Sequence, residues 1–239
     1  MGVESVDRLD STVVRTNMAR SCYIVNVPAD LVSTDRPRRR SDGAATHVAI
    51  LDAAMRIASI EGLGSLTIGR LARDLGISKS GVFAHFASKL ELQRETIEAA
   101  RVVFEREVLR PGLAAPEGLG QVAAFCEAYL AYVERGVFPG GCFFAHVLAE
   151  FDAQDGPIHA EVVADNRAWI QVIVRQIEVA KRLGEIARDA EAEQLAFELI
   201  AALEFANYLS TLVRDPSVVE RGRRSVGAAI ARARVKPGI

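Results

Sequence analysis

The chain repeats one pattern along most of its length: apolar residues recur every three or four positions, and glycine or proline ends each run. The first firm run begins at Thr46 and ends at Gly62, with Ile50, Ala54 and Ile57 on one face. The later runs, of roughly 12 to 28 residues, have the length of helices. No stretch alternates apolar and polar residues with the period of two that a half-buried strand shows. The pattern therefore predicts an all-α fold.

From residue 118 onward the runs follow one another with short connections. Neighbouring helices joined by short connections run antiparallel, so we expect these helices to pack as a bundle. The predicted helices span residues 118–135, 141–152, 157–183, 190–213 and 216–234. The first 35 residues lack such periodicity, and Pro28 and Pro37 interrupt any helix there, so we expect a poorly ordered extension over residues 1–43 with a basic end.

Charge is distributed unevenly along the chain, although the net charge is only −2. Between Arg36 and Arg94 ten Arg or Lys residues stand against five Asp or Glu, whereas residues 95–239 carry sixteen against twenty-one. A chain needs such asymmetry if one part meets phosphates while the rest avoids them. A solvated charged face would produce the same distribution, so the charge becomes informative only together with a motif.

Composition argues against a membrane, secreted or metal-binding protein. No apolar run reaches the 18 or so residues of a membrane span. Acidic residues occupy the N-terminus, where a signal peptide would be basic. The three cysteines, Cys22, Cys126 and Cys142, show neither CxxC nor Cys/His spacing. We therefore expect a cytoplasmic protein that associates with no membrane and needs no metal or cofactor.

The most informative segment runs from Thr67 to Phe86 and has the pattern of two short helices joined by a tight turn. Thr67 can cap the first helix, and Gly76 can end it, because glycine accepts a positive φ without steric cost. Ser78 can cap the second helix, which would bury Val82 and Phe86. The other face of that helix is small and polar, which is the kind of surface that a DNA major groove admits.

Another helix start follows directly. The sequence Ser88-Lys-Leu-Glu91 matches a capping box. It places the Lys89 ammonium in the first helical turn, where a cation is unfavourable for the helix dipole. This position favours a functional role for Lys89, namely contact with a DNA phosphate.

Together these residues resemble the DNA-binding signature of the TetR family of transcriptional regulators. The resemblance covers Ile50 to Leu92 and includes Leu-Gly-Ile-Ser-Lys at 75–79 and His-Phe-x-Ser-Lys at 85–89. It implies a helix-turn-helix DNA-binding domain over residues 44–92, with the helix at 78–86 in the major groove. It further implies a helical ligand-binding and dimerisation domain over residues 93–235. The implied function is a ligand-responsive repressor, which binds a palindromic operator as a homodimer and is released by a small apolar effector.

The resemblance assigns roles to individual residues of this sequence. The implied DNA-binding residues are Thr67, Ser78, Lys79, Ser80, Gly81, Phe83, Ala84, His85 and Lys89. Phe83 departs from the family, which commonly has a tyrosine whose hydroxyl reaches a phosphate, and phenylalanine offers only apolar contact. His85 is either a phosphate donor or a surface histidine without a partner. The run Arg36–Arg40 is either a solubilising segment or an arm that enters the minor groove or binds phosphate.

In the second domain, bulky aromatic residues accompany a few polar ones. Such a set usually lines a small-molecule pocket, although the same residues also build cores. The predicted ligand-binding residues are Phe104, Phe125, Tyr129, Phe143, His146 and Trp169. Cys142 has two interpretations, a redox sensor or an inert buried thiol.

The helix predicted at 190–213 is apolar on almost every side, which indicates burial on more than one side. Its apolar residues include Leu195, Phe197, Leu199, Ile200, Leu203, Phe205, Ala206 and Leu209. The following helix carries Val226, Ala229 and Ile230 on one face. We expect these two helices to form an intermolecular four-helix bundle in a homodimer.

Two other classes of protein fit parts of the pattern. An enzyme or carrier could use the helical body, but the sequence holds no Ser/His/Asp, paired-carboxylate, metal or phosphate-loop constellation, and its four histidines are scattered. An architectural DNA-binding protein without an effector would be basic throughout, whereas residues 95–239 hold more acidic than basic residues.

Overall fold

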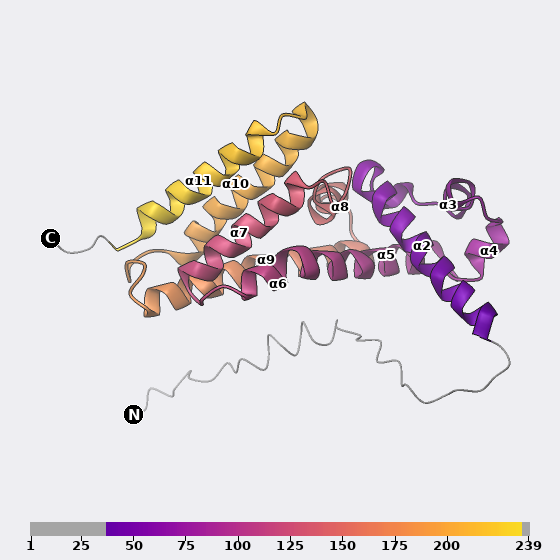
Figure 1. The fold of residues 1–239 in the computed structure, drawn as a ribbon, viewed down its shortest axis with the longest axis horizontal. Coiled ribbons are helices and arrows are strands. Elements are labelled where there is room, and N and C mark those ends of the chain that lie inside the picture. Colours follow the sequence, from indigo (N-terminus) through magenta and orange to yellow (C-terminus); the bar gives the residue numbers. More distant parts are fainter. Residues whose placement is uncertain (1–36, 236–239) are drawn as a thin grey trace, which may run out of the picture. The chain divides into compact units, whose positions relative to one another are not determined.

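The computed structural model describes residues 37–235, and over this range the regular structure is helical, with one isolated β-bridge between Ile186 and Arg234 (Figure 1). The predicted all-α fold is confirmed. Residues 1–36, which hold most of the predicted extension together with Cys22 and Arg36, lie outside the described residues.

Helix α2, Pro37–Glu61, begins before Thr46, where the apolar periodicity starts. Residues 37–43, which the sequence analysis assigned to the extension, are therefore helical. Pro37 stands at the first position of the helix, where its fixed φ is favourable and its missing N–H leaves no hydrogen bond unmade. The sequence of the first turns is rich in arginine and has no apolar face, so periodicity could not detect them.

Three short elements follow α2: the 3₁₀ turn η1, Leu63–Ser65, then α3, Ile68–Leu75, and α4, Lys79–Phe83. They share a core with α2 and the next long helix. Side chains in this core that are at most 1% exposed are Ile50, Ala54, Leu63, Leu66, Leu71, Val82, Phe86 and Leu92. Burial of each large apolar side chain stabilises the fold by about 1.5–3 kcal/mol, which holds the short helices in place.

A long helical segment leads from this unit into the rest of the chain. It consists of α5, Lys89–Phe104, the π-helical turn η2, Glu105–Leu109, and α6, Arg110–Leu113. A π-turn within an α-helix introduces one extra residue and is commonly found at functional sites. Here it directly follows Phe104, one of the predicted ligand-binding residues.

The remaining five helices are α7, Leu119–Glu134, α8, Phe143–Phe151, α9, Pro157–Arg182, α10, Ala192–Val213, and α11, Ser217–Ala233. Their bounds agree with the predicted ranges to within two residues. Helix α10 packs against α7, α9 and α11, and α11 also packs against α7, as in the predicted bundle (Figure 1). The short α8 packs on α9.

Helix α10 divides its apolar residues between two faces. Leu195, Leu199 and Leu203 are at most 7% exposed and belong to the core of the protomer. Phe197, Phe205 and Tyr208, in contrast, are 60–68% exposed. The predicted burial of this helix on more than one side is therefore met within the protomer for the leucines, and the exposed aromatic face stays available to a second protomer. Val226, Ala229 and Ile230 of α11 are likewise buried within the protomer.

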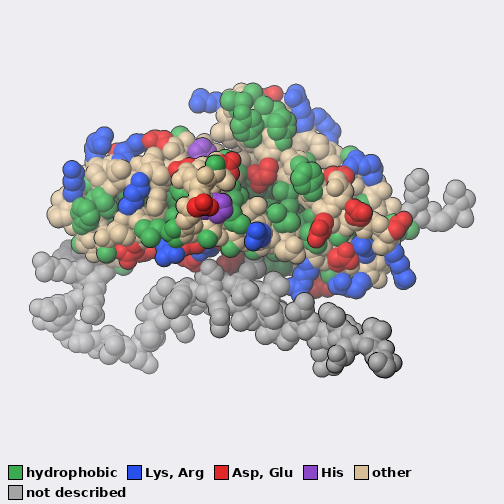
Figure 2. Space-filling model, turned by 180° about the vertical axis from the view of Figure 1, so that it is seen from behind, with side chains coloured by type: hydrophobic (Ala, Val, Ile, Leu, Met, Phe, Trp, Pro, Cys, Tyr) green, Lys and Arg blue, Asp and Glu red, His purple; other side chains and the backbone are tan. Residues whose placement is uncertain are grey.

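Among the described helices, α10 alone is long and apolar enough, by length and composition, to cross a membrane, and only 28% of its most apolar window is buried. In Figure 2, hydrophobic side chains gather at the top of the molecule, over the junction of α10 and α11. Exposed apolar surface of this extent on a helix indicates contact with another surface.

Candidate DNA-binding surface and effector site

The helix-turn-helix forms through the local interactions that the sequence predicted. The Thr67 hydroxyl accepts a hydrogen bond from the Arg70 N–H, at 3.1 Å, and the Ser78 hydroxyl accepts one from the Gly81 N–H, at 3.0 Å. Gly76 ends α3 with a φ of 66°, which a side chain would disfavour. Val82 and Phe86 are fully buried, as predicted.

Helix α4 is shorter than the predicted helix at 78–86. It ends at Phe83, and Ala84 and His85 form a turn in which the His85 N–H donates to the Val82 carbonyl, at 3.0 Å. The tighter i to i+3 bond replaces the next α-helical turn, because Phe86 must turn inward to reach the core.

The predicted DNA-binding residues come from the start of α3, from α4 with its flanking residues, and from the start of α5. Seven of them are exposed: Thr67, Ser78, Lys79, Ser80, Phe83, Ala84 and Lys89. Gly81 and His85 are half-buried. Phe83 is 57% exposed, which is unusual for so large an apolar side chain in a folded protomer.

His85 has neighbours that the sequence analysis did not assign to it. Its ring lies 5.6 Å from the His47 ring and 6.3 Å from the Phe86 ring, measured between centroids. His47 stacks on Phe86 and lies 2.9 Å from a carboxylate oxygen of Glu95. These ring contacts do not decide between the two interpretations of His85, so its phosphate role stays a prediction.

Lys89 also has a contact within the protein. Its Nζ donates to the Gly64 carbonyl at 2.5 Å. An ammonium group has three N–H donors, so one such bond leaves donors for a phosphate. The helix start beneath it is capped, since the Ser88 hydroxyl accepts from the Glu91 N–H and the Glu91 carboxylate accepts from the Ala87 N–H.

The turn η1 is held by a carboxylate that the sequence analysis missed. Glu150 of α8 accepts hydrogen bonds from the N–H groups of Leu63, at 2.6 Å, and Gly64, at 2.7 Å. Gln93 of α5 donates to the Leu63 carbonyl. A Cβ on Gly64 would meet the Glu150 carboxylate at 2.5 Å, so the close approach depends on glycine. We call these contacts of Glu150 the η1 clamp. They join α8 to η1, the turn that precedes α3.

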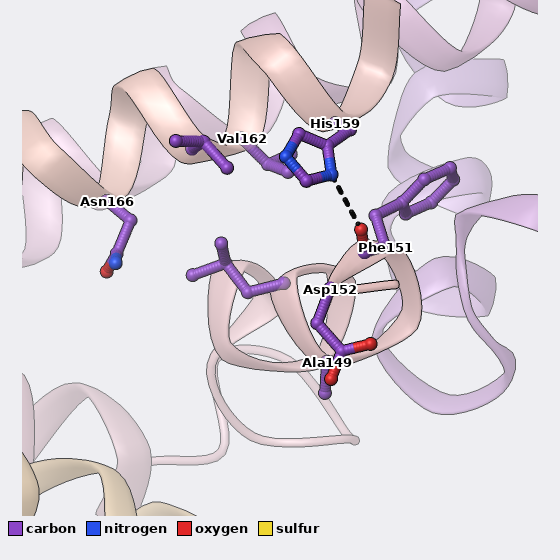
Figure 3. A pocket seen from close by; sticks show the side chains of 8 residues that line it. Ala149, Phe151, Asp152, His159, Val162 and Asn166 are labelled. Atoms are coloured by element: carbon purple, nitrogen blue, oxygen red, sulfur yellow. Dashed lines mark hydrogen bonds between the residues drawn. The ribbon is translucent and has the colours of Figure 1, made fainter. Parts of the chain in front are cut away.

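A pocket of about 410 Å³ lies between α8 and α9. Its lining residues are Leu148, Ala149, Phe151, Asp152, His159, Val162, Val163 and Asn166. Figure 3 shows His159 Nδ1 donating to the Phe151 carbonyl, at 2.9 Å, beside apolar and carboxylate side chains. Asp152 and His159 were not among the predicted ligand-binding residues, because a single acid or histidine has no local pattern that marks it.

Most predicted ligand-binding residues meet in an aromatic cluster next to this pocket. The Phe104 ring contacts the rings of Tyr129 and Trp169, and the Phe125 ring contacts Trp169, with centroids 5.4–6.4 Å apart. Phe143 joins through Phe144, which also contacts Phe104. His146 is half-buried on α8, and no ring contact joins it to the cluster.

Burial controls the ionisation of the polar groups near the cluster. It raises the pKa of Cys142 to about 12 and the pKa of Tyr129 well above the usual range. A thiol with so high a pKa is protonated at neutral pH and unreactive, which supports the interpretation of Cys142 as an inert buried thiol. Burial likewise raises the pKa of Cys126 to about 12.

Two protein families match segments of this chain. Residues 50–96 match the family of bacterial regulatory proteins named tetR, and residues 118–226 match the tetracyclin repressor-like C-terminal domain. The first match covers the helix-turn-helix with the start of α5, and the second covers α7 to most of α11. No curated protein matches the chain.

Solved structures match over most of the chain. A TetR transcriptional regulator from Chloroflexus aurantiacus is 25% identical, with 82% of this chain and all of that chain covered and a TM-score of 0.73. A transcriptional regulator from Saccharomonospora viridis in complex with choline is 20% identical, with 81% and 100% covered and a TM-score of 0.64. AibR, in complex with isovaleryl coenzyme A and operator DNA, is 20% identical, with 68% and 85% covered and a TM-score of 0.57. The chain thus belongs to the TetR family of bacterial transcriptional regulators.

Proposed function

We propose that this protein is a cytoplasmic, ligand-responsive repressor that binds a palindromic operator as a homodimer and is released by a mostly apolar small molecule. The observation that carries the proposal is the capped α3–Gly76–α4 unit, which exposes a small, polar helix face beside two exposed lysine side chains. Such a face suits the major groove, and the cations suit the phosphates.

Within this proposal, Lys79, Ser80, Gly81 and Ala84 face the bases. Thr67, Phe83, His85 and Lys89 face the sugar-phosphate backbone, with Phe83 in apolar contact only. The proposal assigns the chain no catalytic step. The acidic excess of residues 95–239 argues against an architectural protein that coats DNA with its whole surface.

The homodimer would form through the exposed face of α10. Phe197, Phe205 and Tyr208 stand about one or two helical turns apart on this face, so they form a stripe that a second copy can cover. The same burial explains the high hydropathy of α10 without a membrane.

The η1 clamp offers a route from effector to DNA. Glu150 stands between Ala149 and Phe151, which both line the pocket, and its carboxylate holds the turn that leads into α3. An effector that displaces α8 would move Glu150 and thus the helix-turn-helix. The separation of the two recognition helices would then no longer match the spacing of operator half-sites.

The effector response can be tested with DNA selected from a random pool. Apolar compounds are screened for release of this DNA and for a shift in thermal unfolding. Linkage requires that a releasing compound bind the DNA-bound protein more weakly by the same factor by which it weakens DNA binding. A repressor without effector control would keep its DNA under every compound that binds it.

A further inference from the structure

A half-buried acid in the helical body lacks a positive partner. The carboxylate of Glu204, on α10, accepts a hydrogen bond from the Tyr129 hydroxyl, at 3.0 Å. Within residues 43–235, no Lys, Arg or His lies within ion-pair distance of it. Burial raises the pKa of Glu204, partly offset by the bond from Tyr129, as expected for a carboxylate withdrawn from water. A carboxylate that is partly withdrawn from water and has no cation beside it can gain a cationic ligand as its partner.

Aromatic rings and a second unsatisfied group stand beside this acid. Trp169 stacks on Tyr129, with centroids 6.3 Å apart and an angle of 16° between the planes. The Phe104 ring lies nearly perpendicular to the rings of Tyr129, Tyr132 and Trp169. Trp169 is 8% exposed, and its Nε1–H is buried without an acceptor. Buried donors are nearly always satisfied, so this one marks a place where a missing partner belongs.

The pocket and the aromatic cluster lie along the same two helices, α8 and α9. Val162 and Asn166 line the pocket, and Trp169 follows at the next turn on the same side of α9. On α8, Leu148 lines the pocket, and Phe144, four residues earlier, packs edgewise on Phe104 with centroids 5.8 Å apart. The same faces of α8 and α9 thus carry the pocket of about 410 Å³ and, about one turn further along, Phe144 and Trp169 of the aromatic cluster.

Building on the proposed function, we infer that the effector is a hydrophobic organic cation that also carries one hydrogen-bond acceptor. Its charge pairs with Glu204, its acceptor takes the Trp169 N–H, and aromatic ring faces surround its charged end. Ring faces attract cations through their quadrupoles, and the attraction grows when water is excluded. A neutral ligand would leave Glu204 unpaired, and an anion would be repelled by it.

Matched probes separate charge from shape. 4-Methoxybenzyl-trimethylammonium has the required cation, ring and acceptor, and 1-methoxy-4-neopentylbenzene is its neutral isostere, with carbon in place of nitrogen. Trp169 is the single tryptophan of the chain, so intrinsic fluorescence reports directly on this site. We expect the full-length protein to bind the cation at least about ten-fold more tightly than the neutral isostere. Benzyl-trimethylammonium, which lacks the ether acceptor, should bind more weakly than its methoxy analogue.

Two carboxylate variants test whether Glu204 causes the preference for the cation over its neutral isostere. E204Q keeps the size of the side chain and should remove the preference for the cation over its isostere. E198Q, on the same helix, alters an exposed carboxylate that pairs with Arg232 and should retain the preference. The isostere comparison uses the unsubstituted protein, so it stands even if E204Q folds poorly.

The inference is overturned if the cation does not bind, if both probes bind equally, or if the preference survives in E204Q. The proposed function is tested separately, because operator binding is measured without any compound. A protein that selects an operator and releases it with neutral compounds would be a repressor with a different effector class.

Discussion

Glu204 connects the stability of the fold to pH. Its pKa in the folded protein is raised above the usual 4.5 by burial. At pH values between these two pKa values the folded state binds more protons than the unfolded state, so stability falls as pH rises through this interval. The neighbouring Tyr129, Tyr132 and Cys142 have raised pKa values and stay protonated there.

The first prediction follows from this fall of stability with rising pH. Replacing Glu204 with Gln removes the ionisation, so E204Q should be more stable than the unsubstituted protein at pH 8, and this advantage should shrink toward pH 4. Denaturant unfolding at both pH values measures the difference. E198Q is the control and should show no comparable trend. An advantage that does not depend on pH would mean that Glu204 has the same pKa in the folded and the unfolded protein.

The second prediction concerns the two exposed lysines of the helix-turn-helix. K79A and K89A should each weaken operator binding and lower the slope of log affinity against log salt by about one unit per protomer, or about two per dimer. K89A should weaken binding similarly for all DNA sequences, because a phosphate contact carries no sequence information. Fluorescence anisotropy at several salt concentrations gives the slopes. An unchanged slope for K89A would mean that its bond to Gly64 is its whole role.

Individual residues could be predicted from the sequence where their hydrogen-bond partners lie close by in the chain. Thr67, Ser78 and Gly76 act within three or four positions of themselves, so sequence spacing sufficed. Glu150 could not be predicted, because its partners lie 86 and 87 positions away. No rule of spacing brings α8 to the turn before α3; only the packed tertiary structure does.

Helix α8 lines the pocket and also holds the turn η1 through Glu150. The third prediction is that E150Q destabilises the protein by about 1–3 kcal/mol, because an amide has one acceptor oxygen for the two N–H groups that the carboxylate satisfies. It should also reduce the factor by which an effector weakens operator binding. E178Q, which removes a partly exposed pair with Lys181 within one helix, should change stability by less than about 1 kcal/mol.

Stability and operator release measured on the same samples decide the role of the η1 clamp. If E150Q loses stability but keeps the full effector response, the clamp is structural and the signal takes another path. A loss of both is the result that the proposed route requires.

The fourth prediction separates the two faces of α10. F197E with F205E should give folded monomers with weak operator binding, because these side chains are more than 60% exposed in the protomer. L203E should instead unfold the protomer, since Leu203 is completely buried. L183E alters an exposed leucine outside α10 and should leave the dimer intact. Sedimentation with circular dichroism distinguishes these outcomes; a dimeric F197E/F205E variant would place the interface elsewhere.

The positions of most helices could be predicted from the sequence, but the neighbours that cover each face of a helix could not. The apolar sides of α10 indicated burial, yet sequence could not tell a leucine covered by α7 or α9 from a phenylalanine left for a partner. For the aromatic residues, too, sequence could not tell a residue that packs in a cluster from one that lines a pocket. Phe104, Tyr129 and Trp169 do meet in space, but the open pocket beside them is lined by other residues. The start of α2 was missed because its first turns carry charge rather than an apolar face.

For the whole molecule, the uneven charge and the helix-turn-helix have a common consequence. The basic segment lies in the DNA-binding part, and the acidic excess lies in the body, so only the helix-turn-helix end should approach phosphates. In a homodimer two such ends must approach the same duplex. The operator should then consist of two inverted half-sites.

The most direct test of this account is the architecture of DNA selected from a random pool by the full-length protein. We predict enrichment of one inverted repeat, bound by a single dimer, whose half-site centres lie about 34 Å apart or at a small multiple of that distance. Footprinting and sedimentation of the complex measure the spacing and the stoichiometry. Failure to enrich any sequence, or enrichment of a single half-site bound by one protomer, would contradict the account.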